Sequence, residues 1–154
     1  MKTMHKIMVG AVALVCFGGL TGSLSAQFSR PEDAIKYRKS VMLIIAHHFG
    51  RLGDMVKGVE TYEQGTFTDN AALIEKISML SREAFLTPGS DKGDTTMKAS
   101  VLKDPEEFRK LSLTFQQETI QLVSDAKSND VDAVKRQFGN VAKSCKNCHR
   151  QVRK

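Results

Sequence analysis

Cys145-Lys146-Asn147-Cys148-His149, close to the end of the chain, is the stretch around which the rest of the sequence is organised. Cys-x-x-Cys-His is the attachment signal of a covalently bound c-type haem. The two thiols add to the two vinyl groups of the porphyrin, and the histidine that follows offers its neutral imidazole to the iron. The motif therefore predicts haem c held through Cys145 and Cys148, with His149 as an axial iron ligand.

The same cysteine pair has other interpretations, which fit the rest of the chain less well. A bare Cys-x-x-Cys can form a disulfide or half of a zinc site, but a structural zinc site needs two more ligands, and the chain has no second pair of cysteines. A thioredoxin-like redox pair lies near a βαβ pattern, which this sequence lacks. We therefore favour haem attachment.

Residues 1–26 have the pattern of a secretory signal peptide. Lys2 and Lys6 precede an apolar run over residues 7–20, and small residues follow up to Ala26. The run is shorter than the roughly 20 residues that span a bilayer, which disfavours a membrane anchor. We expect a mature chain of residues 27–154 in the periplasm, with no membrane attachment after cleavage. Export agrees with the motif, because bacteria attach haem c outside the cytoplasmic membrane.

The charge of the chain is mildly basic. The formal net charge of +6 falls to +4 once Lys2 and Lys6 leave with the signal peptide. No basic run is interleaved with aromatic residues, and basic residues are interspersed with acidic ones. The charge therefore affects solubility and encounter rates and does not indicate nucleic-acid binding.

Four stretches of the mature chain have the three-and-four spacing of apolar residues that is typical of helices. The first opens at Pro31 and is expected to stop at Gly58; the second has N-cap candidates at residues 68–70 and continues to Phe85. A loop rich in Pro, Gly, Ser and Thr follows over residues 87–100, the longest of the chain.

The third stretch opens at Asp104-Pro105, and residues 128–130 cap the fourth. The apolar residues of the fourth form an unbroken seam that includes both cysteines: Val131, Val134, Phe138, Val141, Cys145, Cys148 and Val152.

With no period-two strand pattern, these stretches predict an all-α antiparallel four-helix bundle with covalently bound haem c. The haem then takes the place of core side chains, so we expect the apoprotein to fold poorly.

A haem motif at the C-terminus of a four-helix chain resembles the class II cytochromes c and, within them, the cytochrome c′ family. The resemblance covers the mature chain and is most specific over residues 27–38, 48–58 and 138–149. It implies a five-coordinate, high-spin haem whose sixth position faces an apolar pocket. It also implies a homodimer that binds nitric oxide and carbon monoxide or passes electrons to a periplasmic redox partner, without being an enzyme.

The resemblance also implies further residues near the haem. Met42 corresponds to the residue of the distal pocket, and Arg153 corresponds to an arginine near the proximal histidine, on the same helix face as His149. Relatives often carry tryptophans around the long loop, and this chain has none. The remaining correspondences are to positions near the haem propionates or to a loop that touches the haem: Arg38, Lys39, Ser90 and Asp91.

Met42 leaves two functions open. Its thioether can ligate the iron, which makes the protein a low-spin electron carrier, or it can pack as a flexible apolar side chain and leave the iron open to gases. We favour packing. Peroxidase chemistry needs a distal acid or base, and no His, Glu or Asp falls on the first-helix stripe near Met42. His47 and His48 point about 100° apart on a helix and cannot share a metal ion.

Overall fold

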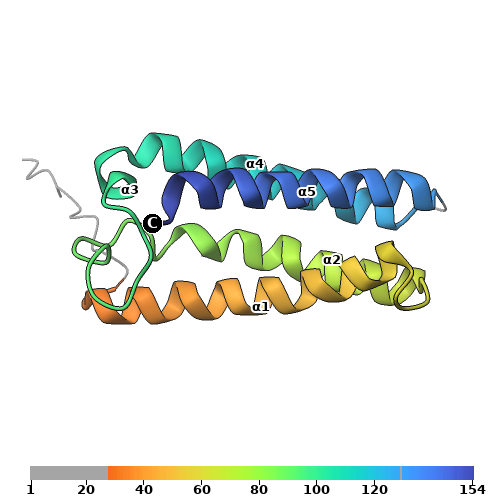
Figure 1. Cartoon of the computed structure of the whole chain (residues 1–154), viewed down its shortest axis with the longest axis horizontal. Coiled ribbons are helices and arrows are strands. Elements are labelled where there is room, and N and C mark those ends of the chain that lie inside the picture. The colour runs from red at the N-terminus through yellow and green to blue at the C-terminus, as the bar shows by residue number, and fades with distance from the viewer. Residues whose placement is uncertain (1–27, 129) are drawn as a thin grey trace, which may run out of the picture.

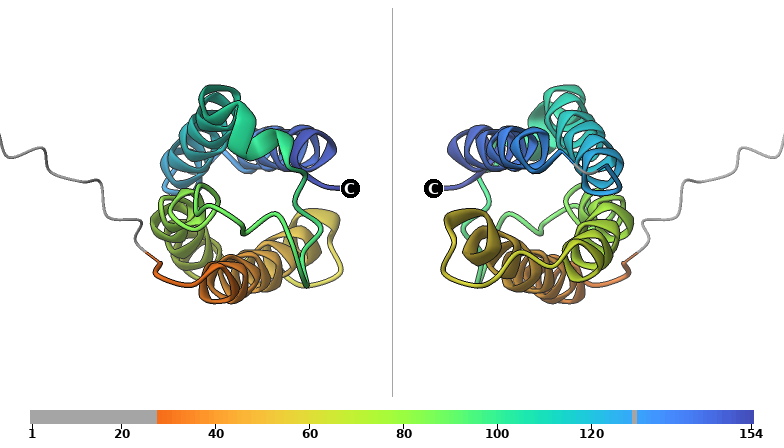
Figure 2. Two further views of the ribbon diagram at one scale, coloured as in Figure 1. Left: turned by 90° about the vertical axis from the view of Figure 1, so that its left-hand side faces the viewer. Right: turned by 90° about the vertical axis from the view of Figure 1, so that its right-hand side faces the viewer.

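The computed structural model describes residues 28–128 and 130–154, so the predicted signal peptide lies outside the described residues. Four long helices, α1, α2, α4 and α5, pack side by side as a bundle in which chain neighbours run antiparallel (Figures 1 and 2). The bounds of the elements are α1 Pro31–Lys57, α2 Gln64–Ser78, the 3-10 turn η1 Leu80–Arg82, α3 Ser100–Lys103, α4 Pro105–Ala126 and α5 Val131–Val152.

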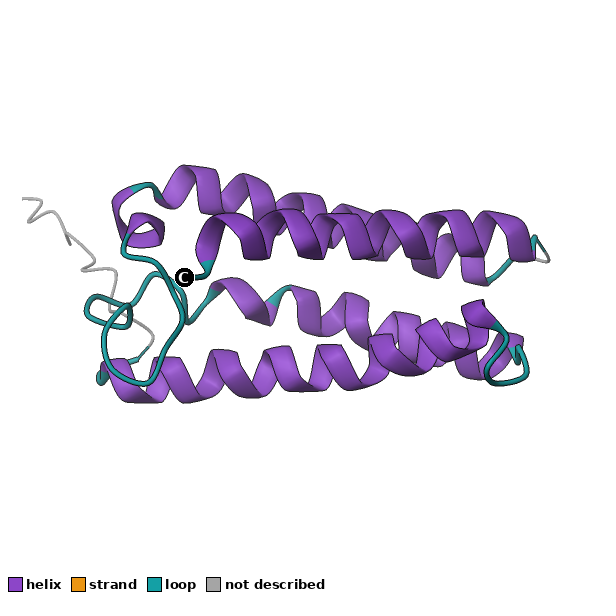
Figure 3. Cartoon of the chain, viewed as in Figure 1, coloured by secondary structure: helices purple, strands orange, loops and turns teal. Residues whose placement is uncertain are grey.

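The described residues form no strand beyond one isolated bridge between Met97 and Arg153 (Figure 3). The all-α four-helix prediction is confirmed. Across the same residues, no helix has the length and apolar character needed to cross a membrane.

Three of the helix ends follow from local chemistry, as the sequence predicts. The Asp104 carboxylate accepts a hydrogen bond from the Glu107 backbone N–H at 3.0 Å, which caps α4. The Asp130 carboxylate accepts one from Ala133 at 2.9 Å, which caps α5. Gly58 ends α1 with a φ of 74°, a left-handed conformation that glycine adopts without steric cost.

The prediction for α2 is wrong at both ends. The helix begins at Gln64, before the predicted caps at residues 68–70, and it ends at Ser78 instead of Phe85. Thr68 and Asn70 do not cap, because their side chains donate to backbone carbonyls one turn earlier, to Gln64 at 2.8 Å and to Thr66 at 2.7 Å.

The early start of α2 has a tertiary cause. The Gln64 amide donates to the carbonyls of Ala126 and Ser128, at 3.2 and 2.9 Å, and so ties the first turn of α2 to the end of α4. Phe67 is fully buried one turn further on. At the other end, Ala84 and Phe85 are buried outside any helix, so the long connection spans residues 83–99 and not 87–100.

The predicted seam of α5 faces the core over most of its length. Val134, Val141 and Val152 are buried, whereas Val131 is 37% exposed at the first turn, contrary to the prediction. The Phe138 ring stacks on the Phe49 ring of α1, with 4.3 Å between centroids. A Cβ at Gly53 would lie 3.3 Å from the tip of the Phe138 ring, so the absence of a side chain there allows the close approach of α1 and α5.

A matched pair of substitutions tests this core. Ile74 on α2 is 1% exposed, whereas Ile120 on α4 is 51% exposed. We expect Ile74→Ala to lower the free energy of unfolding of the holoprotein by about 2–5 kcal/mol, because it leaves a cavity, and Ile120→Ala to change it by no more than about 0.5 kcal/mol. Denaturant unfolding followed by circular dichroism measures both, and equal effects would contradict the assigned core.

Candidate functional site

Both motif cysteines lie on the inner side of α5, where they continue its buried seam. Their thiols are partly buried and form no disulfide. Cys145 packs against the apolar cluster that runs along the bundle, and Cys148 packs against a second cluster near the C-terminus. Burial raises the pKa of both thiols, that of Cys148 to about 11 with a further contribution from Cys145. Two neutral thiols therefore face the interior from one side of one helix.

His149 follows at the edge of this interior face. The side chain is exposed on the surface of α5, yet the buried part of its ring lowers the pKa of the imidazole, and the nearby charge of Arg153 lowers it further. Both effects favour the neutral ring, which is the form that ligates a metal.

Arg153 lies beyond the helix, which corrects the prediction that it shares a helix face with His149. α5 ends at Val152, and Arg153 has an extended conformation with a φ of −109°. Two backbone hydrogen bonds hold this end against the long loop, from Lys98 N–H to the Val152 carbonyl and from Lys154 N–H to the Thr96 carbonyl, each at 2.8 Å. The Arg153 Nε also donates to the Thr96 hydroxyl at 3.2 Å. We call this end of the chain, residues 152–154, the strap. The Arg153 guanidinium, which lowers the pKa of His149, lies on the strap.

Arg38 is buried on α1, and the hydrogen-bond partners of its guanidinium come from the long loop. Its Nη1 donates to the Ala84 carbonyl at 3.3 Å, and its Nη2 donates to the Ser90 carbonyl and to the Thr95 hydroxyl. The guanidinium carbon lies 5.4 Å from the centre of the Phe85 ring. Burial lowers the pKa of Arg38, and the charge of Asp91 opposes this shift.

The other predicted loop residues cluster beside Arg38. Lys39 pairs with the exposed Asp94 carboxylate at 2.7 Å, and Asp91 is half-buried. Ser90 is fully buried, and its hydroxyl has no hydrogen-bond partner among the described residues. Sequence reasoning missed Thr95 as a partner of Arg38, because no motif marks a loop threonine that a distant arginine reaches.

Met42 projects from α1 into the same apolar cluster that Cys148 contacts from α5. The structure thus places the predicted distal residue of α1 and one of the predicted haem-attachment cysteines of α5 against the same cluster. Every member of this cluster is apolar: Met42, Phe85, Met97, Val101, Leu102, Phe108, Leu111, Cys148 and Val152.

The arrangement fits a haem. α1 and α5 contact each other far less than α1 and α2, α2 and α4, or α4 and α5 do, so the seam between α1 and α5 is the most loosely closed of the bundle. Apolar walls suit a porphyrin face, and the unpartnered Ser90 hydroxyl and the remaining guanidinium N–H groups of Arg38 are donors suited to its carboxylates.

The adjacent histidines of α1 lie apart from this region. The His48 Nδ1 lies 2.7 Å from the Asn70 side-chain oxygen, and the rings of His47 and His48 meet edge to face. The described part of the chain holds no group of three or more His, Cys, Asp or Glu side chains placed to bind a metal ion.

Comparison with known proteins gives one family. The family model described as Cytochrome C′ matches residues 33–153. The curated cytochrome c′ of Alcaligenes xylosoxydans xylosoxydans is 36% identical over 128 residues, which are 83% of this chain and 98% of that protein. The curated cytochrome c′ of Rubrivivax gelatinosus is also 36% identical, over 80% of this chain and 95% of that protein.

Solved structures give the same result. Cytochrome c prime from Shewanella frigidimarina superposes with a TM-score of 0.79 at 37% identity, over 82% of this chain and 98% of that one. A mutant of cytochrome c prime from Alcaligenes xylosoxidans, solved as its nitric oxide complex, superposes with a TM-score of 0.77 at 34% identity, over 83% of this chain and 98% of that one.

The contacts of Arg38 predict that this residue orders the long loop. Arg38→Gln removes the guanidinium, whose Nη2 donates to the Ser90 carbonyl and to the Thr95 hydroxyl. We expect backbone amide exchange over residues 84–97 of the holoprotein to become at least about tenfold faster. Lys39→Gln, which removes only an exposed ion pair on the same helix, should leave exchange nearly unchanged. Equal exchange in Arg38→Gln and the unsubstituted protein would show that the loop is held by other contacts.

Proposed function

The chain belongs to the cytochrome c′ family and carries covalent haem c, and from this premise we propose that it is a periplasmic, high-spin haem protein that binds nitric oxide and carbon monoxide and exchanges electrons. The nitric oxide complex of the Alcaligenes xylosoxidans relative supports gas binding. The signal-peptide pattern of residues 1–26 supports the location. We assign no enzymatic reaction, because the apolar cluster around Met42 contains no acid or base.

In this proposal Cys145 and Cys148 would hold the haem through their sulfur atoms, and the neutral His149 imidazole would ligate its iron. The bound haem supplies an iron centre that takes up a diatomic gas or changes its oxidation state by one electron. Arg153 helps to keep His149 neutral, since its charge lowers the pKa of the ring. Arg38, Lys39, Ser90 and Asp91 would form the polar edge of the site, and Arg38 and Lys39 hold the loop through the Ser90 carbonyl and the Asp94 carboxylate.

The observation that carries the proposal is the environment of Met42, which packs against the same wholly apolar cluster as Cys148. Bound dioxygen accumulates negative charge and is stabilised by a hydrogen-bond donor, whereas nitric oxide and carbon monoxide depend on one much less. Arg38, one helical turn before Met42, is the nearest buried cation on α1, and the loop carbonyls engage its guanidinium. The pocket therefore favours nitric oxide and carbon monoxide over dioxygen.

Met42 itself decides between this function and the alternative, a low-spin electron carrier with the Met42 thioether as sixth ligand. In the favoured case the ferrous holoprotein has a five-coordinate, high-spin spectrum without added ligand. Met42→Ala then keeps that spectrum and binds carbon monoxide several-fold faster, because the pocket is larger. Optical spectra and flash photolysis measure both. A low-spin spectrum that becomes high-spin only in Met42→Ala would instead establish ligation.

We further propose a homodimer that forms through α1 and α2. Leu43 and Ile44 on α1 are 71% and 42% exposed, and Leu73 on the neighbouring α2 is 36% exposed. Large apolar side chains grouped on two adjacent helices are typical of a protein interface.

A charge placed on that surface tests the dimer. At micromolar protein concentration we expect the unsubstituted protein to be a dimer and Leu43→Glu to be a monomer. The new carboxylate would lose its hydration in the interface, which makes association unfavourable. Ile120→Glu on the exposed side of α4 is the control and should remain dimeric. Sedimentation velocity distinguishes the two states. A monomeric unsubstituted protein, or dimers of both variants, would exclude this interface.

A further inference from the structure

The positive charge of the chain is concentrated on its last helix. Residues 131–154 hold seven basic side chains and one acidic side chain, a formal charge of +6. Residues 27–130 hold fourteen basic and sixteen acidic side chains, a charge of −2. Basic and acidic residues are interspersed over the rest of the chain, and α5 is the exception. All of the positive excess of the mature chain therefore lies on the helix that carries the haem motif.

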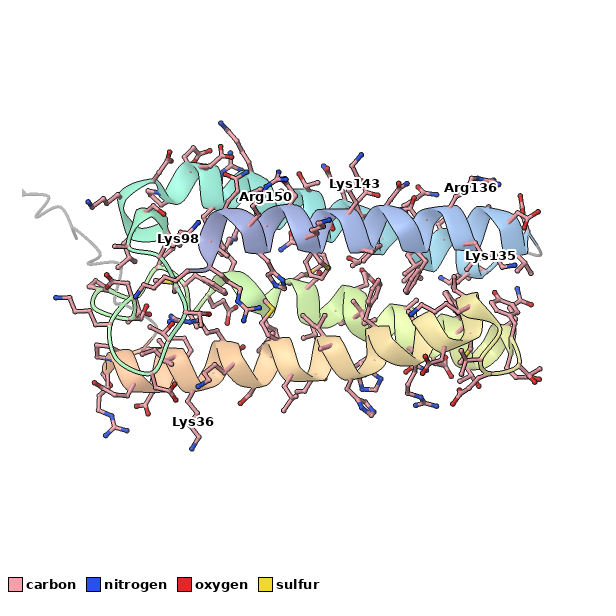
Figure 4. The ribbon with its side chains drawn as sticks, in the orientation of Figure 1. Lys36, Lys98, Lys135, Arg136, Lys143 and Arg150 are labelled. Atoms are coloured by element: carbon pink, nitrogen blue, oxygen red, sulfur yellow. The ribbon has the colours of Figure 1, made fainter. Side chains whose placement is uncertain are left out.

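Helix stability does not account for this charge. The partial negative charge of a helix C-terminus favours cations only in the last turn, which includes Arg150 but not Lys143. Lys135 and Arg136 lie in the first half of α5, where the dipole gives them no advantage. Figure 4 shows Arg136, Lys143 and Arg150 along α5, on the side of the bundle opposite to Lys36 of α1.

The basic side chains border a groove between α4 and α5 with a volume of about 530 Å³. No carboxylate of the described residues forms an ion pair with Lys143, Lys146 or Arg150. Glu118 is the one acidic residue among those that line the groove, and its carboxylate accepts a hydrogen bond from Gln137 at 2.6 Å. The lining residues are Thr114, Glu118, Asn140, Lys143, Ser144, Lys146, Asn147 and Arg150.

The groove lies directly behind the haem motif. Lys146 and Asn147, which line it, stand between Cys145 and Cys148, whose thiols face the interior. Only the thickness of one helix, about 10 Å, separates the groove from the thioether side of the site. Since electron tunnelling weakens steeply with distance, a partner seated here has a short path to the haem.

We propose that the α4–α5 groove and the basic face of α5 form a docking surface for an acidic protein that exchanges electrons with the haem. The proposal rests on the proposed haem function and adds the chemistry of the partner. In the step itself one electron passes from the ferrous iron to the oxidised partner, or back from the reduced partner, and no bond or proton moves. The positive face steers such a partner to the helix that carries the motif.

The lining favours an acidic protein over other polyanions. No aromatic side chain lines the groove, so it offers no platform on which nucleotide bases stack. It also lacks the large apolar side chains that anchor a protein in the surface of an anionic membrane. The side-chain amides of Asn140 and Asn147 can donate to carboxylates and backbone carbonyls of a protein, whereas the Thr114 hydroxyl already donates to the Lys110 carbonyl at 3.0 Å.

Binding of a labelled twelve-residue polyglutamate peptide to the ferric holoprotein tests the surface. The groove variant is Lys143→Glu/Arg150→Glu, which leaves the motif intact, and the control is Lys36→Glu/Lys57→Glu, which makes the same change of net charge on exposed positions of α1. At low ionic strength, fluorescence anisotropy should show binding weakened about tenfold or more in the groove variant and less than about threefold in the control. Equal weakening would overturn the proposal, because net charge alone would explain it. Tighter binding of single-stranded DNA or anionic vesicles, lost in the groove variant, would also overturn it.

Oxidation of the ferrous protein by hexacyanoferrate(III), followed by stopped flow, tests the electron path. The anion takes one electron from the iron, and the rate should fall several-fold further in the groove variant than in the control. Equal rates in the two variants would overturn the assignment of this face to electron exchange. Peptide binding needs no redox change, so failure of the proposed haem function, which the optical spectra would reveal, remains distinguishable from failure of the docking surface.

Discussion

The apolar stripe of α5 is the feature on which the rest of the bundle depends. Val134 and Val141 are completely buried on this stripe, and Cys145 and Cys148 follow at the same helical spacing. Burial of the stripe therefore fixes the rotation of the helix about its axis, and the same rotation directs both thiols inward. α1 and α5 contact each other sparingly, and on the inner side of α5 the cysteines pack against the two apolar clusters of the bundle. The rotation of α5 that buries its valines is thus the same rotation that sets the direction of the two cysteines.

A second constraint acts on the long loop, which lies over one end of this region and is held there at two points. The strap at Val152 and Lys154 holds the loop to the end of α5, and the guanidinium of Arg38 holds it to α1. A buried guanidinium loses its hydration, and bonds to loop carbonyls and a hydroxyl compensate for that loss without any buried carboxylate. The loop therefore depends on Arg38, and Arg38 depends on the loop to remain buried.

The contrast between α2 and the other helices shows how far the sequence specifies this fold. Asp104, Asp130 and Gly58 are read correctly because each acts on backbone groups within one turn of itself. The start of α2 is misplaced because Gln64 and Phe67 act on α4 and the core, and no local pattern marks such contacts. The site divides in the same way. The thiols and the imidazole follow from a motif, whereas the partners of Arg38 lie more than forty residues away in sequence.

The two faces of α5 also explain why the net charge of the whole chain gives no indication of its strongly basic surface. A net charge of +4 for the mature chain describes neither the strongly basic last helix nor the weakly acidic remainder. The inner face of α5 must be apolar to pack, so its basic residues can lie only on the outer side, and they come together beside α4 because α4 is its closest neighbour. Apolar burial on one side, and on the other the cations of Lys143, Lys146 and Arg150, which form no ion pair with a carboxylate of the described residues, thus place an electrostatic field directly behind the haem motif. A negatively charged molecule that this field attracts would therefore approach α5, the helix that carries the haem motif.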